Sequence, residues 1–487
     1  MLMNQQMSCI IRLVLFLKTI LKILFNNIEN IVYKLFLIGE GDVMSTKGFT
    51  FKGGIHPPHF KKQTEHLEIE NAKEPNVVVI PLQQHIGAPC DALVTVGQTV
   101  KVGQKIGESK AFVSANVHSS VSGIVKSIEM RNSSGGMKVN CIVIESDGRF
   151  EVDESVKPKG DVDKLSKDEL LAIIKEAGLT GMGGAGFPTH VKLSPPKDKV
   201  IDVVIINGAE CEPYLTADHR IMLEKAEDVV IGAKAVKKAV GVEKCYIAIE
   251  KNKPDAIEVM KKALLNVEGI EVAELETKYP QGDEKRLINA VTGKVVPSGG
   301  LPMDVGVVVN NVGTIATLGN IIKTGMPVVQ RVVTVTGSAI KNPKNLYIRI
   351  GTLFSEVIEQ CGGFSEEPGK IINGGPMMGI AQFTTDVPVI KGTSGILVLN
   401  KKDATIEEPQ NCIRCGKCVE VCPVNLQPLV ISKLSLLNKY DEAEGYHALD
   451  CIECGSCSFV CPSKRKLIES IRVAKREIVA KRRKTGK

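Results

Sequence analysis

The stretch GLTGMGGAGFPTH, Gly178 to His190, decides how the middle of this chain is interpreted. From Gly181 to Gly186 it has the G-x-G-x-x-G spacing of a dinucleotide-binding fingerprint, in which a strand leads into the glycine turn. Here SKDELLAIIKEAG comes before it and predicts a helix, because Ser166 and Glu169 form a capping box and Gly178 is placed as a C-terminal stop. The glycine turn is therefore not predicted to be the first turn of a Rossmann domain.

Residues 161–325, around this stretch, alternate predicted helices and strands. KVIDVVIING is a near-continuous apolar run, and KCYIAIE, IEVAEL and DVGVVVNN repeat the pattern, as the strands of a buried parallel sheet do. TADHRIMLEKAEDVVIGAKAVKKAVG predicts one long amphipathic helix after the first of these strands. We predict an α/β domain, Rossmann-like in its alternation, that binds its ligand at the C-terminal ends of the strands.

β-rich segments lie on both sides of this domain. Residues 44–150 contain alternating Val and Thr runs split by glycines, which predicts a barrel or sandwich. The V-x-x-G-Q rhythm resembles the hammerhead domains that carry biotin or lipoate, but FVSANVHSSVSG has no lysine at the expected carrier position, which favours a structural barrel-sandwich domain. His56 and His118 are interpreted as turn or core residues. In residues 329–400, RVVTVTGSAI and GILVLN around the helix TLFSEVIEQCGG predict a soluble-ligand-binding β-grasp domain.

Two cysteine runs dominate residues 405–465, which are otherwise predicted to be helical. CIRCGKCVEVCP and CIECGSCSFVCP both follow C-x2-C-x2-C-x3-C-P, with 28 residues between Cys422 and Cys451. They resemble the runs of two-cluster ferredoxins, in which three cysteines hold one [4Fe-4S] cluster and the fourth ligates the other. Zinc is the alternative, but zinc favours isolated pairs of ligands. The resemblance implies one cluster on Cys412, Cys415, Cys418 and Cys461, and the second on Cys451, Cys454, Cys457 and Cys422.

This use of cysteine indicates metal binding in a reducing compartment, not a disulfide framework. Electrons that enter an iron–sulfur chain singly and leave as hydride need a two-electron converter. Flavin is the usual one. We therefore expect a flavin site elsewhere in the chain, and the glycine stretch is the first candidate for it.

Four motifs of the α/β segment resemble those of the NADH-binding flavoprotein subunit of respiratory complex I. They are GMGGAGFPTHVK, NGAECEP, YPQGDE and NNVGT, in the order of that family. With KGGIHPP near the start, SANVHSSVSG in the barrel and the cysteine runs, the domain plan is similar to the C-subunit family of Rnf complexes. These are membrane-bound, ion-translocating ferredoxin:NAD⁺ oxidoreductases. The resemblance implies a peripheral electron-transfer subunit on the cytoplasmic face of the membrane, an NADH-dependent flavin and iron–sulfur oxidoreductase.

The same resemblance implies which residues bind FMN and NAD(H). Phe187 would stack on the nicotinamide, Lys192 would balance the anionic flavin, and Glu212 would contact NADH. Glu284 matches a further NADH-contacting position, with a helix N-terminal charge as the alternative, and Tyr279 fits a core aromatic equally well. The other implied cofactor-binding residues are Gly181, Gly183, Gly184, Gly186, Asn207, Glu210, Asn310 and Asn311.

The motifs depart from the family where Ala209 and Gly313 replace carboxylates and Asp283 replaces Glu. Two alternatives therefore stay open. One is a soluble relative with the same domain plan, such as a cobalamin reductase of microcompartments, and the other is an iron–sulfur scaffold without flavin. The favoured interpretation implies membrane and iron–sulfur subunits of the same complex as partners, with ferredoxin acting through them. A net charge of +7 is too modest to predict nucleic-acid binding.

The two ends of the chain are unusual in composition. From Lys464 onward there are eleven basic and two acidic residues, so residues 466–487 form a basic tail. It is either a solvated helix end or a dock for anionic lipid or an acidic protein partner. Residues 1–43 are apolar, but charges interrupt them before a run of about 18–20 residues could span a bilayer. They predict either an amphipathic surface helix or, as we prefer, an extension from a mis-assigned start, with Met44 as the true start.

Overall fold

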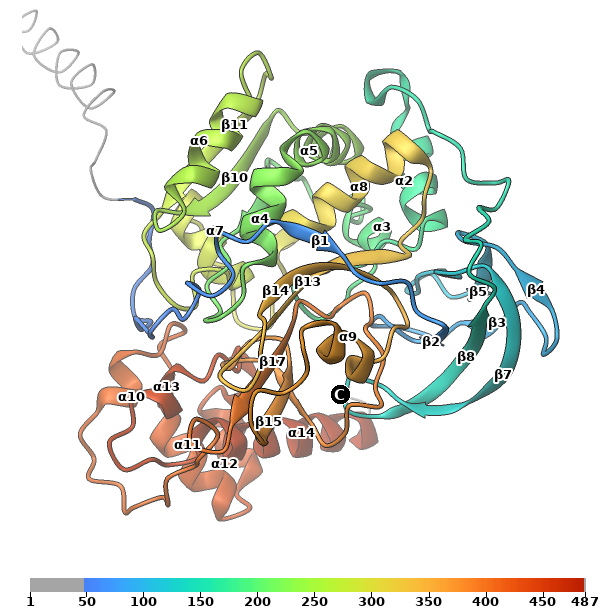
Figure 1. Cartoon of the computed structure of the whole chain (residues 1–487). Helices are drawn as coiled ribbons and strands as arrows, with labels where there is room; N and C mark the ends of the chain where they lie inside the picture. Colours follow the sequence, from blue (N-terminus) through green and yellow to red (C-terminus); the bar gives the residue numbers. More distant parts are fainter. Residues whose placement is uncertain (1–47, 486–487) are drawn as a thin grey trace, which may run out of the picture. The chain divides into compact units, whose positions relative to one another are not determined.

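A computed structural model describes residues 48–485 of the chain (Figure 1). The predicted extension of residues 1–43 lies outside the described residues. Four hydrophobic cores correspond to the α/β domain, the β-grasp domain, the barrel and the cysteine-rich domain. In the described part of the chain no helix is both long enough and apolar enough to cross a membrane.

The α/β domain is built on a parallel sheet in the order β11-β10-β9-β12. Its strands alternate between two cores, so that Val204 and Ile206 pack against one helical layer and Ile205 faces the other. This confirms the prediction of a sheet covered on both faces. The strands are β9 (Val203–Gly208), β10 (Lys244–Glu250), β11 (Ile270–Leu275) and β12 (Val307–Asn311).

The helix before the glycine stretch is α2 (Lys167–Glu176), and it confirms the sequence prediction. The Ser166 side chain accepts from the Glu169 N–H while the Glu169 carboxylate accepts from the Ser166 N–H. Gly178 follows with a φ of 64°. The remaining helices of the domain are α3 (Thr189–Lys192), α4 (Ala217–Glu224), α5 (Ala226–Val240), α6 (Pro254–Ala263), α7 (Glu284–Thr292) and α8 (Val312–Thr324).

The single long helix predicted after β9 is wrong, because the segment divides into α4 and α5 at Lys225. The division lets α5 pack directly on α8. A Cβ added to Gly232 would lie 2.0 Å from the Ile315 carbonyl oxygen, so the two helix backbones touch. Helical periodicity continues through Lys225 without a Gly or Pro, and so the sequence pattern could not show the break.

The barrel has two small sheets in the orders β2-β8-β7-β4 and β3-β5-β6. Its core includes the buried strand residues Val78 and Ile80, and His118 is buried beside them, in agreement with its predicted core role. The strands are β2 (Val77–Pro81), β3 (Asp91–Ala92), β4 (Thr99–Val100), β5 (Lys105–Glu108), β6 (Val117–His118), β7 (Gly123–Asn132) and β8 (Lys138–Ser146).

The β-grasp domain has a mixed sheet in the order β1-β14-β13-β17-β15-β16, packed against α9 (Phe354–Gln360). The edge strand β1 (Ile69–Asn71) comes from the N-terminal part of the described chain and pairs in parallel with β14. The other strands are β13 (Gln330–Thr336), β14 (Lys344–Arg349), β15 (Pro368–Asn373), β16 (Ile380–Gln382) and β17 (Gly395–Asn400).

The cysteine-rich domain is helical, as predicted. Each cysteine run contains one short helix that begins after a glycine of positive φ, Gly416 or Gly455. The long helix α14 begins in the basic tail and packs on α11 and α12. The helices are α10 (Lys417–Glu420), α11 (Pro428–Leu436), α12 (Tyr440–Gly445), α13 (Ser456–Phe459) and α14 (Leu467–Thr485).

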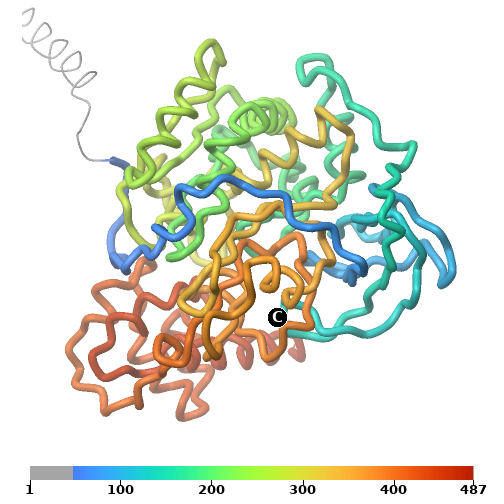
Figure 2. The backbone as a smooth tube through the Cα atoms, viewed as in Figure 1, coloured from blue at the N-terminus to red at the C-terminus, as the bar shows by residue number. Residues whose placement is uncertain are grey.

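Residues 49–71 form a strap, in blue in Figure 2, that runs between these domains. Gly54 donates its N–H to the Val421 carbonyl of the first cysteine run at 2.9 Å, and Ile55 exchanges backbone hydrogen bonds with Tyr279 of the α/β domain. A Cβ on Gly53 would lie 2.9 Å from the Cys422 carbonyl oxygen. The KGGIHPP motif thus holds two domains together, and its glycines allow this close approach.

Candidate functional site

The glycine loop is held by contacts from three domains. Met182 donates its N–H to the Thr314 hydroxyl at 2.9 Å, and its carbonyl accepts from buried Arg331 of the β-grasp domain at 3.2 Å. The carbonyl of Gly186 accepts from the Ile86 N–H of the barrel at 3.2 Å. The conformation of the loop is therefore fixed from outside the motif itself.

The four predicted glycines do not have equal surroundings. A Cβ on Gly183 would lie 2.6 Å from the Asn311 side chain, and Gly186 has a φ of 69°, so neither position accepts another residue easily. A Cβ on Gly184 would meet nothing within 4 Å, and a Cβ on Gly181 would meet only ordinary contacts. Gly184 is exposed. It therefore faces open space, where a flat ligand could approach the backbone.

Three predicted asparagines lie at the C-terminal ends of the adjacent strands β9 and β12. Asn207 donates to the Gly282 carbonyl, and Asn311 caps α8 while donating to Asp218 at 2.7 Å. By contrast, the buried Nδ2 of Asn310 has no hydrogen-bond partner within the described residues. A buried donor without a partner is costly, so this amide suits an acceptor on a bound ligand.

Lys192 and Glu284, predicted from separate motifs, form an ion pair of 2.6 Å beside the loop. Glu284 is the first residue of α7, so it also has the helix N-terminal position considered as its alternative. Phe187 is half-buried, and its carbonyl accepts from the Gly181 N–H at 2.9 Å, which closes the loop. The structure therefore brings these motifs together.

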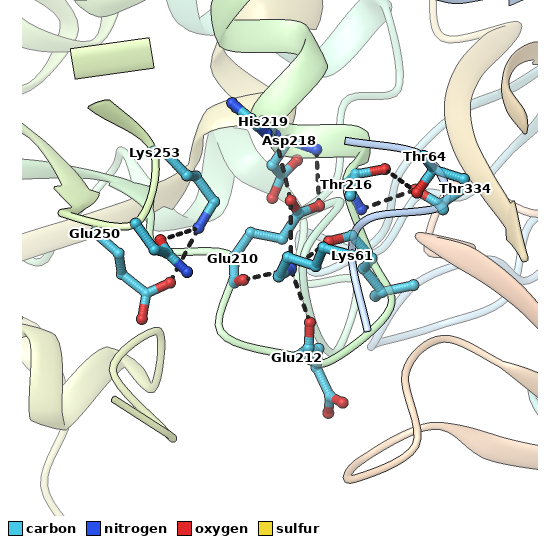
Figure 3. Close-up of polar contacts among 12 residues, drawn as sticks. Lys61, Thr64, Glu210, Glu212, Thr216, Asp218, His219, Glu250, Lys253 and Thr334 are labelled. Carbon is cyan, nitrogen blue, oxygen red and sulfur yellow. Dashed lines mark hydrogen bonds and ion pairs between the residues drawn. The ribbon is translucent and has the colours of Figure 1, made fainter. Parts of the chain in front are cut away.

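Glu210 is held within the protein (Figure 3). Its carboxylate accepts from the N–H groups of Asp218 and His219 at the start of α4, at 2.9 and 3.3 Å. The Nζ of Lys61 lies 3.9 Å from the same carboxylate. Burial, with Glu210 adding to it, raises the pKa of Asp218 to about 7. Glu210 thus stabilises the first turn of α4, and its predicted contact with FMN stays a prediction.

Lys61 was not predicted from the sequence, although it is central to this region. It is buried, and its Nζ donates to the Glu210 and Glu212 carbonyls at 2.9 and 3.0 Å and also to the Leu215 carbonyl. Burial lowers its pKa, and Glu210 opposes that effect. Lys61 follows the KGGIHPP motif in the strap, but no spacing rule marks a lysine as buried. The strap therefore fixes the loop that carries Glu210 and Glu212.

Glu212 points away from Glu210 in Figure 3. Its carboxylate accepts from the backbone N–H groups of Met377 and Met378 in the β15–β16 loop, at 3.1 and 2.8 Å. Burial raises the pKa of Glu212 to about 7, while these hydrogen bonds act in the opposite direction. The residue predicted to contact NADH therefore also holds a loop of the β-grasp domain.

The barrel contributes a wall beside the glycine stretch. The ring of Phe112 packs edge-on against His190, with centroids 6.0 Å apart, and the Phe112 carbonyl lies 3.2 Å from His190 Nε2. Phe112 is the first residue of FVSANVHSSVSG, the segment that has no lysine at the carrier position. A fixed contact to the flavin motif fits the predicted structural barrel better than a swinging arm does.

The cysteines line two separate cavities, and the two sets match the crossed ligation that the ferredoxin resemblance implies. No group of three or more His, Cys, Asp or Glu side chains within residues 48–485 is close enough to hold a single metal ion. A four-iron cluster is larger than one ion, and each cavity offers it four thiols. Cys412, Cys415, Cys418 and Cys461 line one cavity. Cys422, Cys451, Cys454 and Cys457 line the other.

The second cavity adjoins the α/β domain. Tyr279 is 1% exposed, and its hydroxyl donates to the Cys454 carbonyl at 2.8 Å. Arg286 of α7 donates to the Pro423 carbonyl at 2.6 Å. Both residues belong to the segment that carries Glu284 beside the glycine loop. The YPQGDE motif therefore connects the candidate flavin site with the second set of cysteines.

Comparisons with known families agree with this domain order. A model described as the Nuo51 FMN-binding domain matches residues 174–320, and the RnfC barrel sandwich hybrid domain matches residues 49–149. An SLBB domain matches residues 332–381, and a 4Fe-4S dicluster domain matches residues 404–462. The predicted fold class, a multidomain chain with these four domain types, is confirmed.

Curated relatives match nearly the whole chain. It is 56% identical to the C subunit of the Na⁺-translocating ferredoxin:NAD⁺ oxidoreductase complex of Acetobacterium woodii, over 91% of this chain and 100% of the relative. It is 53% identical to the proton-translocating counterpart of Clostridium ljungdahlii, over 88% of this chain and 94% of the relative. The C subunit of the ion-translocating oxidoreductase complex of Rhodobacter capsulatus is 41% identical, over 79% and 75% of the two chains.

Proposed function

Because this chain belongs to the C-subunit family of ion-translocating ferredoxin:NAD⁺ oxidoreductase complexes, we propose that it passes electrons between NADH and other subunits through FMN and two clusters in a fixed order. The chain is an oxidoreductase subunit with an NADH/FMN-binding domain and a 4Fe-4S dicluster domain. When bound, FMN supplies the exchange between hydride transfer and single-electron transfer. The remaining steps depend on this chain's own residues.

We place FMN over the glycine loop. The exposed backbone at Gly184 would form the floor of its site, and the unpartnered Asn310 amide would donate to it. Lys192, already paired with Glu284, would offer a positive charge at the edge of the site. Phe187 and Glu212 would orient the nicotinamide. The Asn310 amide carries this proposal, because its buried donor has no partner within the described chain.

We place the cluster on Cys422, Cys451, Cys454 and Cys457 next to the flavin, because Tyr279 joins that set to the YPQGDE motif. The cluster on the other four cysteines then lies farther along the path. Cys412 and Cys415 are exposed, so this outer cluster suits exchange with another subunit. In this proposal the other subunits carry the coupling ion across the membrane. The position of the chain is proposed to be peripheral, at the cytoplasmic face of the membrane.

Anaerobic titration of the reconstituted chain tests the flavin assignment. We expect bound FMN to be bleached by NADH, and Asn310→Ala to weaken FMN binding about tenfold, the effect of losing one buried hydrogen bond. Asn140→Ala, at an exposed barrel position, is the control and should bind FMN normally. A chain that holds both clusters but neither binds FMN nor responds to NADH would leave the scaffold alternative instead.

The glycines provide a second test with a matched pair. Gly183→Ala should unsettle the loop even without ligand, because the new Cβ would collide with Asn311. Gly184→Ala should leave the stability of the ligand-free chain unchanged, because its Cβ meets open space, and yet weaken FMN binding. Thermal unfolding with and without FMN separates the two effects. Equal behaviour of the two variants would contradict the proposed floor at Gly184.

A further inference from the structure

We propose that a groove beside the second set of cysteines is the docking surface for a segment of another subunit, one that carries acidic and apolar side chains together. This rests on the proposed function only in that the partner belongs to the same complex. We call this surface the tail groove, because α14 of the basic tail forms one side of it. Its volume is about 670 Å³, and it is lined by Met378, Gly379, Ile380, Ala381, Cys451, Ile452, Glu453, Arg472 and Lys475.

The tail groove lies against the second cysteine set. Cys451 and Ile452 line both the groove and the cavity that contains Cys422, Cys454 and Cys457. A segment seated in the groove would therefore contact Cys451, one of the four ligands proposed for that cluster. Docking at this place would also cover that side of the enclosed cluster from water.

The polar side of the groove is positively charged. Glu453 accepts from Arg472 at 2.9 Å and pairs with Lys475 at 2.6 Å, so two cations face one carboxylate. Arg476 and Arg483 are exposed and continue along the same face of α14 at helical spacing. By contrast, Lys481 and Arg482 pair with Asp441 and Glu444 on another face. Arg476 and Arg483, which form no ion pair within residues 48–485, thus extend the positive charge from the groove and favour an acidic occupant.

The opposite side of the groove is apolar and unusually exposed. Met378 is 48% exposed and Ile380 is 44% exposed, and Phe383, just beyond them, is 82% exposed. Met137 at the tip of the β7–β8 hairpin is 72% exposed. The hairpin lies against β16, because the Ser134 carbonyl accepts from Gln382 of β16 at 3.0 Å. Exposed large apolar side chains gathered beside a hollow are typical of protein interfaces, and methionine adapts to a partner's shape.

A protein segment fits this surface better than a lipid headgroup layer does. Arg472 and Lys475 lie in the lining of the groove, where a flat bilayer surface would touch only the rim, whereas a peptide side chain can enter. The chain's own residues 1–47 are a poor occupant, since they have five basic and three acidic residues. We therefore assign the acidic and apolar segment to another chain.

The test purifies the complex through a tag on a different subunit. It then measures how much of this chain stays bound to the complex as the salt concentration rises. Arg476→Glu reverses an exposed charge, and Ile380→Asp places a charge on the apolar side. We expect each to weaken retention about tenfold at moderate salt. Lys262→Glu on α6 makes the same charge change at another exposed position and should leave retention unchanged. Equal retention of all three variants would overturn the proposal.

A second arm separates protein from lipid. Pure chain and its Arg476→Glu variant are mixed with vesicles of phosphatidylglycerol or of phosphatidylcholine. We expect the pure chain and its variant to bind each kind of vesicle equally and weakly. If Arg476→Glu lost binding to phosphatidylglycerol vesicles but kept normal retention on the complex, the surface would be a lipid dock and the proposal would be overturned. Flavin and cluster spectra of each variant are recorded in parallel. Failure of the proposed function would appear in these spectra, independently of retention.

Discussion

The two cysteine runs have the same sequence pattern and nearly the same backbone, yet they lie in different surroundings. Arg414 and Glu453 occupy equivalent positions with φ values of 55° and 59°. Ile413 of the first run is 68% exposed, while Ile452 of the second run packs with Tyr279 in a small core. The difference comes from outside the runs, since the strap and the β15–β16 loop cover only the second set. A repeated motif can therefore give one enclosed and one open metal site when other domains cover one copy.

The strongest test of this comparison removes one ligand from each set. Cys457→Ser should abolish the enclosed cluster and with it NADH-driven reduction of the open cluster, because the path from the flavin is cut. Cys461→Ser should remove only the open cluster, although it lies in the second run. Electron paramagnetic resonance and iron analysis check this, with a loss of about half the iron in each variant. Loss of the enclosed cluster in Cys461→Ser would contradict crossed ligation.

Chelation should also distinguish the two sets. Cys412 and Cys415 are exposed, while Cys454 and Cys457 are buried. An iron chelator added to the oxidised protein should therefore remove the open cluster first, about tenfold faster than the enclosed one, because the enclosed set is reached only after local opening. Cluster-specific spectra followed over time measure this. Simultaneous loss would mean that the covering domains do not protect the second set.

Glu212 tests the loop that borders the enclosed set. Its pKa is raised by burial to about 7, so the folded chain binds a proton there that the unfolded chain has released. Stability from this group is therefore fully present below a pH of about 4.5 and is lost as the pH rises to about 7. We expect the free energy of unfolding to fall by up to about 3 kcal/mol more in wild type than in Glu212→Gln over this interval. Denaturant unfolding at several pH values, without cofactors, measures the difference.

The smallest expected effect comes from the Tyr279 hydroxyl. Tyr279→Phe removes the hydrogen bond to the Cys454 carbonyl and keeps the ring, so it should cost about 1 kcal/mol of stability. Reduction of the enclosed cluster by NADH should slow slightly, while the intrinsic spectrum of the open cluster stays unchanged. Stopped-flow reduction and thermal unfolding report the two effects. Tyr246→Phe, which removes a hydroxyl from β10 in the α/β domain, is the matched control.

Local patterns predicted much of this molecule because each had a direct physical cause. The capping box at Ser166 excluded a Rossmann turn, and apolar runs marked the strands of the parallel sheet. The two cysteine sets line separate cavities, and the crossed ligation implied by the ferredoxin resemblance stays a prediction. These features depend on residues that are a few positions apart in the sequence, or on fixed spacings between residues of one type.

Long-range packing could not be predicted in the same way. Lys61 and Arg331 are buried cations, and each donates to a backbone carbonyl more than a hundred residues away in sequence, that of Glu210 and that of Met182. No side-chain pattern marks a carbonyl as an acceptor. Glu210 shows the same limit on prediction. The motif identified the residue, but it did not show that both carboxylate oxygens accept hydrogen bonds from the first turn of α4.

The strap also constrains how the chain is made. Residues 49–71 leave the ribosome early, yet their partners Tyr279 and Val421 are synthesised much later. The strap can therefore close only after the first cysteine run has emerged. We expect iron–sulfur assembly enzymes to reach Cys422 in the interval before closure. Insertion of the enclosed cluster would then precede closure of the strap.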